Sequence, residues 1–193
     1  METVSHDLLI LGSGLAGLRA AVEAARVSRG ELDIAIISKT QLMRAHSVCA
    51  EGGTGAALRP EEGDSFELHA WDTIKGSDFL ADQDAVELFV REMPKEILTL
   101  DRWGIPWSRR SDGRIDQRPF GGHSFPRAVF AADKTGFFEM QTLYDTLQRF
   151  ARSVTRYDEC MVTSIIIENG EFRGLTGIDL GSGRFLAFRG KAL

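Results

Sequence analysis

The first forty residues alternate between short apolar runs and a glycine-containing turn, which is the pattern of a βαβ unit. Asp7–Leu11 is an apolar run typical of a buried parallel strand. The turn Gly12–Gly17 follows at once and leads from Leu18 into an alanine-rich stretch that favours a helix. A second apolar run, Asp33–Ile37, closes the unit. The pattern predicts two parallel strands connected by a helix.

The middle of the chain has the periodicity of helices. We expect one helix capped by Asp64 and ending at Gly76, and another capped by Asp82. Pro94 is well placed to begin a third helix, which stops at Gly104. Helices therefore dominate this part of the prediction.

The last third of the chain predicts one long helix and then strands. Gly136–Arg152 has apolar residues spaced to face a core. The turn signals Asn169-Gly170 and Gly181-Ser182-Gly183 separate three apolar stretches. These stretches predict a three-stranded meander: Met161–Glu168, Phe172–Leu180 and Arg184–Arg189.

Composition narrows the class of protein. The 193 residues are 43% hydrophobic and 26% charged, which is typical of a globular chain with a real core. The net charge of −5 gives no basic surface, so we expect no nucleic-acid partner. Cys49 and Cys160 have no metal-binding spacing, and no metal site is predicted.

The first turn matches the dinucleotide motif G-x-G-x-x-G. Gly12 permits the tight turn, Gly14 lets the backbone approach a pyrophosphate, and Gly17 allows close packing of helix on strand. The second strand ends in Ser38-Lys39, where a simple NAD site would carry an acid for the ribose. The serine hydroxyl can still bind ribose, and Lys39 argues against plain NAD.

Several further motifs follow in one order. They are Ile37-Ser38-Lys39, Arg44-Ala45-His46-Ser47-Val48, Ala50-Glu51-Gly52-Gly53, Asp72-Thr73-Ile74-Lys75-Gly76-Ser77-Asp78, Asp82-Gln83-Asp84-Ala85, Arg118-Pro119-Phe120-Gly121-Gly122 and Ala131-Ala132-Asp133-Lys134-Thr135-Gly136. With the glycine turn, they resemble the N-terminal half of the flavoprotein subunits of succinate dehydrogenase and fumarate reductase, from about His6 to Leu193. The resemblance implies an α/β, Rossmann-like FAD-binding domain, of which residues 1–193 are the N-terminal part.

The resemblance also implies the cofactor and its contacts. FAD would be bonded covalently to His46, and this attachment would raise the flavin potential, as oxidation of the unactivated C–H bonds of succinate requires. The cofactor-binding residues implied by the motif and the resemblance are Gly12, Ser13, Gly14, Leu15, Ala16, Gly17, Ser38, Lys39, Arg44, His46, Ser47, Glu51, Gly52 and Gly53. Gly53 and Phe120 would contact the substrate.

We predict no cofactor or substrate contact for His123, and we leave two roles open for the stretch that contains Arg127. His123 lies at a position that varies in the family, so we assign it no role. Arg127 sits in a family-like stretch with Asp133 and Lys134, where a loop-ordering ion pair is at least as good an interpretation as a substrate contact.

The family's reaction needs groups that we do not find in this chain. In that family, a capping domain follows the FAD-binding domain. It supplies the proton-donating arginine and the residues that bind both substrate carboxylates. We therefore expect an N-terminal fragment truncated before the capping and C-terminal helical domains, with no catalytic residue of its own and no turnover in isolation.

The implied reaction interconverts succinate and fumarate by hydride transfer to or from flavin N5. Electrons would pass to an iron–sulfur subunit and then to quinone at membrane anchor subunits. The protein would be peripheral, at the cytoplasmic face of the inner or plasma membrane.

Three alternatives remain open. An L-aspartate oxidase would fit the run Gly121-Gly122-His123-Ser124, but that family has no histidine at the place of His46, and Ala131–Gly136 suits dicarboxylate reductases better. A non-catalytic flavin-binding or assembly module is the second alternative. An NAD-only dehydrogenase is the third, and it leaves the motifs after residue 43 unexplained.

Overall fold

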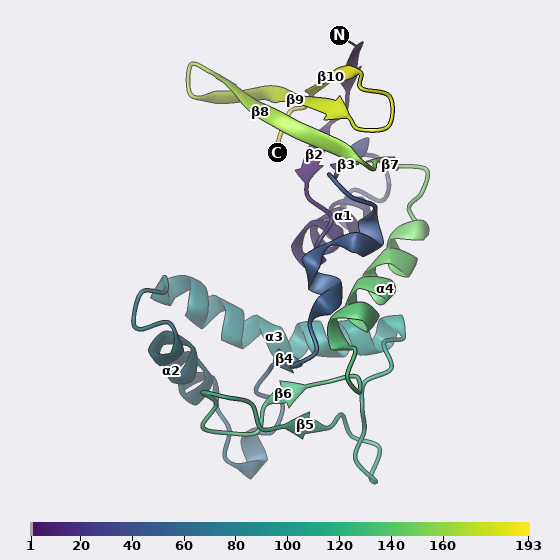
Figure 1. Cartoon of the computed structure of the whole chain (residues 1–193). Coiled ribbons are helices and arrows are strands. Elements are labelled where there is room, and N and C mark those ends of the chain that lie inside the picture. Colours follow the sequence, from purple (N-terminus) through teal and green to yellow (C-terminus); the bar gives the residue numbers. More distant parts are fainter. Residues whose placement is uncertain (1) are drawn as a thin grey trace. The chain divides into compact units, whose positions relative to one another are not determined.

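The computed structural model describes residues 2–193, and the chain divides into two compact units. The first unit contains the residues up to Val48 together with Leu143–Leu193, and the second contains Cys49–Thr142. Figure 1 labels the helices and strands of both. The fold contains both helices and strands, which confirms the predicted α/β class.

The first unit contains a parallel sheet with the strand order β2-β3-β7 (Figure 1). Its strands are β2 (Leu8–Leu11), β3 (Ile34–Ile37) and β7 (Val154–Tyr157). All four residues of β3 are buried, as its unbroken apolar run requires. Helix α1 (Leu15–Val27) connects β2 to β3 and contacts both strands. The predicted βαβ unit is confirmed, whereas β7 was not predicted.

The second sheet of this unit has the order β1-β10-β9-β8. Its strands are β1 (Glu2–Ser5), β8 (Cys160–Glu168), β9 (Glu171–Asp179) and β10 (Phe185–Arg189). Strands β8, β9 and β10 pair antiparallel, which confirms the predicted meander to within one residue at each boundary. The turn between β8 and β9 has φ of +54° at Asn169 and +80° at Gly170, the conformation for which this dipeptide is favoured.

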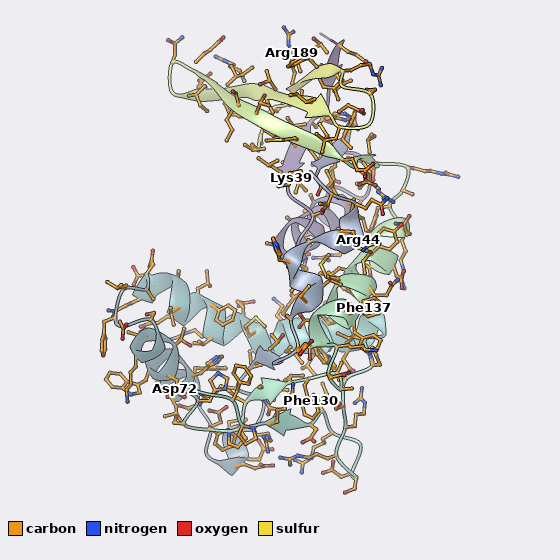
Figure 2. All side chains as sticks on the ribbon, in the orientation of Figure 1. Lys39, Arg44, Asp72, Phe130, Phe137 and Arg189 are labelled. Carbon is orange, nitrogen blue, oxygen red and sulfur yellow. The ribbon has the colours of Figure 1, made fainter. Side chains whose placement is uncertain are left out.

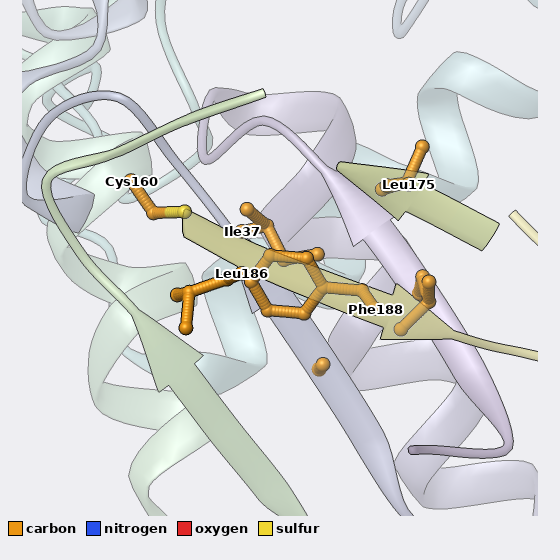
Figure 3. Packing of buried hydrophobic residues seen from close by; sticks show 7 residues of the cluster. Ile37, Cys160, Leu175, Leu186 and Phe188 are labelled. Carbon is orange, nitrogen blue, oxygen red and sulfur yellow. The ribbon is translucent and has the colours of Figure 1, made fainter. Parts of the chain in front are cut away.

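The two sheets of the first unit share one hydrophobic core. Figure 3 shows Phe188 and Leu186 of β10 beside Ile37 of β3. The buried members of this core are Leu9, Ala35, Ile37, Cys160, Leu175, Leu186 and Phe188. Full burial of one leucine, isoleucine or phenylalanine contributes about 1.5–3 kcal/mol, so this core holds the meander on the parallel sheet.

The second unit combines two helices with a small sheet. Helices α2 (Phe66–Gly76) and α3 (Gln83–Trp103) contact each other around Ala70, Val86 and Val90. Three two-residue strands pair antiparallel in the order β4-β6-β5. They are β4 (Thr54–Gly55), β5 (Gln117–Arg118) and β6 (Ala128–Val129). Strands this short carry no periodicity, and the sequence did not predict them.

The helix caps confirm part of the prediction. Asp82 caps α3 by accepting a hydrogen bond from the Ala85 amide at 3.1 Å, and Gly104 ends the helix with a φ of +101°. The predicted cap of α2 is wrong, because Ser65 rather than Asp64 accepts the Leu68 amide, at 3.0 Å. Asp64 is instead buried in an ion pair with Arg127.

The prediction that a third helix begins at Pro94 is also wrong. Pro94 lies inside α3, which continues from Gln83 to Trp103. Val90 and Ile97 are buried on either side of the proline, so one apolar face runs through it. Burial of this face outweighs the local cost of the proline.

The long helix near the end of the chain is shorter than predicted. Helix α4 spans Thr135–Gln148, and the boundary between the two units falls within it. Residues 149–152 form tight turns in place of a further helical turn, with the Phe150 amide donating to the Leu147 carbonyl at 2.9 Å.

Candidate functional site

The glycine turn packs the start of α1 against the end of β2. Gly12 has a φ of +105°, which suits glycine, and its amide donates to the Ile37 carbonyl at 2.8 Å. A Cβ at Gly17 would lie only 2.1 Å from the Gly12 carbonyl oxygen. The helix can therefore begin this close to the strand only because residue 17 has no side chain.

The first turn of α1 is available for an anion. Gly14 is the N-cap and offers no side-chain cap, and the first turn contains no acidic residue. The Leu15 amide donates to Ser47 Oγ at 3.3 Å, while Ala16 and Gly17 are first-turn residues whose amides have no carbonyl one turn earlier. Such amides and the helix dipole favour a phosphate.

Ser38 and Lys39 follow β3 directly and differ in environment. The Ser38 hydroxyl is buried and forms a 2.7 Å hydrogen bond with the Ser13 hydroxyl, so it ties the end of β3 to the glycine turn. Lys39 is exposed (Figure 2). A ribose contact by either residue remains a prediction.

The segment after β3 carries the candidate histidine. Leu42 is buried and anchors the segment, whereas Arg44 and His46 are exposed. His46 begins a short 3₁₀ turn that ends at Cys49. Its neighbour Ser47 reaches the N-terminus of α1, and a Cβ at Gly14 would lie 3.1 Å from the Ser47 hydroxyl. His46 thus presents an accessible imidazole next to the residue that contacts the glycine turn.

In the second unit, Phe120 covers the glycine pair. A Cβ at Gly52 would lie 2.6 Å from the Phe120 ring, so the ring rests on the glycine backbone. Gly53 has a φ of +113°, and a Cβ there would be 2.6 Å from the Val129 carbonyl oxygen. Phe120 is still 53% exposed, which leaves much of its ring free to contact a ligand.

Arg118 holds the same glycine segment and is a residue to which the sequence analysis gave no role. It donates to the Glu51 carbonyl at 2.6 Å and, through two nitrogens, to the Gly52 carbonyl at 2.9 and 3.1 Å. Its guanidinium also lies 4.6 Å from the centre of the Phe130 ring. Arg118 belongs to one of the motifs that carry the family resemblance, but no pattern in the sequence indicates that an arginine will bind backbone carbonyls.

Arg127 forms a buried ion-pair network in the second unit. Its guanidinium is fully buried, and it donates to Asp64 at 2.6 Å and to Asp72, which lies on α2 (Figure 2). Burial alone would raise the pKa of Asp72, but hydrogen bonds from Ser124 and Arg127 keep that pKa below its usual range. The ion-pair interpretation is therefore confirmed for Arg127, whereas Asp133 and Lys134 are exposed and lie outside this network.

Two histidines lie beside this network. His69 is buried, and burial together with the charge of Arg127 lowers its pKa to about 4. Burial and then Arg127 also lower the pKa of His123, whose ring centre is 6.3 Å from that of His69 and 6.1 Å from that of Phe120. Burial and the charge of Arg127 therefore disfavour the charged form of both imidazoles, and His69 is shielded from solvent.

Glu139 is a buried acid near the glycine pair, and the sequence analysis did not identify it. It is 4% exposed and accepts a hydrogen bond from Thr54 Oγ1 at 2.5 Å. Burial raises the pKa of this carboxyl, and the hydrogen bond from Thr54 opposes the rise. Thr54 follows Gly53 directly, so Glu139 holds the segment that contains the candidate substrate contact.

Between residues 2 and 193, no three histidine, cysteine, aspartate or glutamate side chains come together as metal ligands. Within the same range, no helix is both long enough and apolar enough to cross a bilayer.

Comparison with known proteins places the chain among flavoproteins. Residues 7–193 match the FAD binding domain family. A fumarate reductase flavoprotein subunit of Mycobacterium tuberculosis is 48% identical over 182 residues, covering 94% of this chain and 30% of that protein. A succinate dehydrogenase flavoprotein subunit of Rickettsia bellii is 40% identical over 191 residues, covering 95% and 31%.

A solved structure of Escherichia coli quinol fumarate reductase has the same fold. It superposes with a TM-score of 0.93 and 44% identity, covering 99% of this chain and 32% of that chain. The chain spans about a third of the length of the relatives that it matches.

Proposed function

This chain belongs to the FAD binding domain family, and from that premise we propose that it is the FAD-binding part of a flavoprotein subunit that interconverts succinate and fumarate. The resemblance to succinate dehydrogenase and fumarate reductase flavoprotein subunits, the α/β FAD-binding fold and FAD as cofactor are confirmed. The observation that carries the proposal is the 48% identity over 94% of the chain to a fumarate reductase flavoprotein subunit.

The residues of the glycine turn fit a dinucleotide cofactor. Gly17 permits the close approach of α1 to β2, and the first-turn amides of α1 are not blocked by an acidic side chain. When bound, FAD supplies two-electron hydride chemistry at N5. We assign pyrophosphate binding to Gly12, Ser13, Gly14, Leu15, Ala16 and Gly17. The remaining cofactor contacts in the proposal are Ser38, Lys39, Arg44, His46, Ser47, Glu51, Gly52 and Gly53.

We propose that His46 forms the covalent bond to the cofactor. Three observations support this role: the imidazole is exposed, it begins a short 3₁₀ turn, and its neighbour Ser47 hydrogen-bonds to the N-terminus of α1. These place a nucleophilic nitrogen on the segment that borders the phosphate-binding turn. No other histidine in the sequence lies between this turn and Gly53.

Gly53 and Phe120 are the proposed substrate contacts. The exposed part of the Phe120 ring offers an apolar surface for the two carbons between the carboxylates of succinate or fumarate. Glycine at position 53 is required by its positive φ and by the nearby Val129 carbonyl. The proton donor and the groups that bind both carboxylates are proposed to lie outside residues 1–193, so the isolated chain should not turn over.

The proposed partners follow from the relatives. The matched E. coli structure is a quinol fumarate reductase. We propose that electrons pass to an iron–sulfur subunit and then to quinone at membrane anchor subunits. The protein would lie at the cytoplasmic face of the membrane and be held there by these partners.

The first test is the intact mass of the denatured native protein, followed by a tryptic map. We expect one FAD bound covalently to the peptide that begins at Ala45, and we expect the native protein to oxidise succinate or reduce fumarate. In His46→Ser the flavin should be released by denaturation. Cys49→Ser removes the exposed thiol three residues later and should keep the bond.

Other outcomes would contradict the proposal in different ways. Flavin released from the unsubstituted protein would remove His46 from its role, and oxidation of L-aspartate would then replace the proposed reaction. A native protein that binds FAD but turns over neither succinate nor fumarate would support the flavin-binding module instead.

A further inference from the structure

Arg118 binds two successive peptide carbonyls of the glycine segment. Its Nη2 atom donates to the Glu51 oxygen at 2.6 Å and to the Gly52 oxygen at 2.9 Å, and its Nε atom donates to the Gly52 oxygen at 3.1 Å. The guanidinium also lies 4.6 Å from the centre of the Phe130 ring. A planar side chain with several donors is suited to such a fixed arrangement.

These hydrogen bonds fix the direction of the adjacent amides. In a trans peptide the N–H points opposite to the carbonyl, and no peptide bond between residues 2 and 193 is cis. Because the Glu51 and Gly52 carbonyls both point to Arg118, the amides of Gly52 and Gly53 point away from it. Neither amide has an acceptor among residues 2–193, and both glycines are only partly buried.

The charge of Arg118 strengthens these two donors. A cation that accepts electron density from a carbonyl polarises the peptide, and this makes the N–H at its other end a better donor. Two neighbouring amides with one direction form a concave site for an anionic oxygen. The positive φ of Gly53 and the Phe120 ring over Gly52 limit other arrangements of this backbone.

We infer that Arg118 is a positioning residue that holds the Gly52 and Gly53 amides as a two-donor site for an electron-rich oxygen or nitrogen. This inference rests on the proposed function, which names two sources of such an atom: a carboxylate of the substrate and the reduced flavin ring. Arg118 itself touches neither in this inference, since its Nε and Nη2 atoms donate to the backbone.

The test uses the full native polypeptide that carries these residues, in its FAD-bound form. Arg118→Gln removes the charge and the planar set of donors, whereas Arg118→Lys keeps the charge but cannot reproduce the two-carbonyl pattern. Arg114→Gln is the matched control, because Arg114 is an exposed arginine paired with Asp112 on the surface of the same unit. Three quantities are measured: the Kd of fumarate from flavin absorbance, the flavin midpoint potential without ligand, and the unfolding temperature.

The two sources give different results. If the amides bind a substrate carboxylate, both Arg118 variants should raise the Kd of fumarate at least tenfold and leave the ligand-free potential unchanged. If they bind the reduced flavin, the potential should fall by about 30 mV or more, which is a tenfold change for a two-electron couple. Arg114→Gln should change the Kd of fumarate by less than twofold and should leave the flavin potential unchanged.

The inference is overturned if the Kd and the potential of both Arg118 variants equal those of the unsubstituted protein. Should Arg118→Gln fail to fold, Arg118→Lys decides, because it can retain the contact with Phe130. Failure of the proposed function is recognised separately, since the unsubstituted protein would then lack FAD or would show no response to fumarate.

Discussion

Gly17 occupies a position where a methyl group would displace the backbone of the preceding turn. Its Cβ would lie 2.1 Å from the Gly12 carbonyl oxygen and 3.0 Å from the Gly12 carbonyl carbon. Because these are backbone atoms, no rotamer change relieves the clash. We expect Gly17→Ala to destabilise the protein by roughly 1–3 kcal/mol and to reduce retention of FAD. Urea unfolding and the ratio of flavin to protein after gel filtration measure the two effects.

Gly76 provides the control for this substitution. It is the last residue of α2, and a Cβ there meets no atom within 4 Å. Gly76→Ala should be neutral or stabilising by up to about 1 kcal/mol, since glycine is unfavourable in a helix. Equal destabilisation by both substitutions would show that the close contact at Gly17 is not the cause.

Glu139 should make stability depend on pH. Burial raises its pKa in the folded state, so the folded chain holds this proton to a higher pH than the unfolded chain does. The stabilising contribution is complete below the unfolded pKa and is lost as the pH rises through the raised pKa. Glu139→Gln cannot lose a proton, so its stability relative to the unsubstituted protein should increase from pH 5 to pH 8.

Urea unfolding at several pH values in that range measures this difference. Glu87→Gln is the matched control, because Glu87 is an exposed glutamate on α3. The unsubstituted protein and Glu87→Gln should show the same pH profile. A constant difference between Glu139→Gln and the unsubstituted protein at all pH values would mean that the folded chain does not hold the Glu139 proton above pH 5, and would contradict the raised pKa.

At the scale of elements, Pro94 imposes a cost within α3. Proline has no N–H for the Val90 carbonyl one turn earlier, and Val90 is buried. Pro94→Ala restores this hydrogen bond and should stabilise the protein by about 1–3 kcal/mol in urea unfolding. Glu92→Ala, on the exposed side of the same helix, should change stability by less than about 0.5 kcal/mol. A loss of stability in Pro94→Ala would indicate that the proline itself contributes to packing.

Elements with a long periodic pattern were predicted well, and short ones were not. The βαβ unit and the meander follow from repeated apolar positions and from turn residues with special backbone preferences, such as Asn169-Gly170. The two-residue strand β4 is defined only by its pairing with β6, so no pattern of apolar residues in its own sequence predicts it. The prediction at Pro94 was wrong because the preference of proline for the first turn of a helix takes no account of the buried apolar face on both sides of it.

The same distinction applies to the candidate site. The glycine turn could be predicted because its three glycines occur at a fixed spacing and each is required by the backbone at its position. The Arg118 contacts and the Thr54–Glu139 hydrogen bond join residues 66 and 85 positions apart, and their acceptors include backbone carbonyls. Carbonyls are present at every residue, so the sequence does not indicate which of them an arginine will bind.

At the scale of the whole molecule, the proposed contacts are shared between the two units. The glycine turn and His46 belong to the first unit, whereas Gly53 and Phe120 belong to the second. Each unit has its own buried network: the hydrophobic core of the two sheets in the first, and the Arg127 ion pairs in the second. Binding of FAD through the glycine turn of the first unit is therefore expected to be separable from the substrate contact of Phe120 in the second unit.

The final prediction follows from this separation. The isolated 193-residue chain should bind FAD through the glycine turn and so gain stability with FAD concentration, by about 2.7 kcal/mol at a hundredfold excess over Kd. It should show no oxidation of succinate or reduction of fumarate above free FAD, because the proposed proton donor and carboxylate-binding groups lie outside it. Gly17→Ala should reduce the FAD-dependent gain. Turnover above the free-flavin rate would place the catalytic groups within these residues, and a thermal midpoint unaffected by FAD would show that the glycine turn is not sufficient for binding.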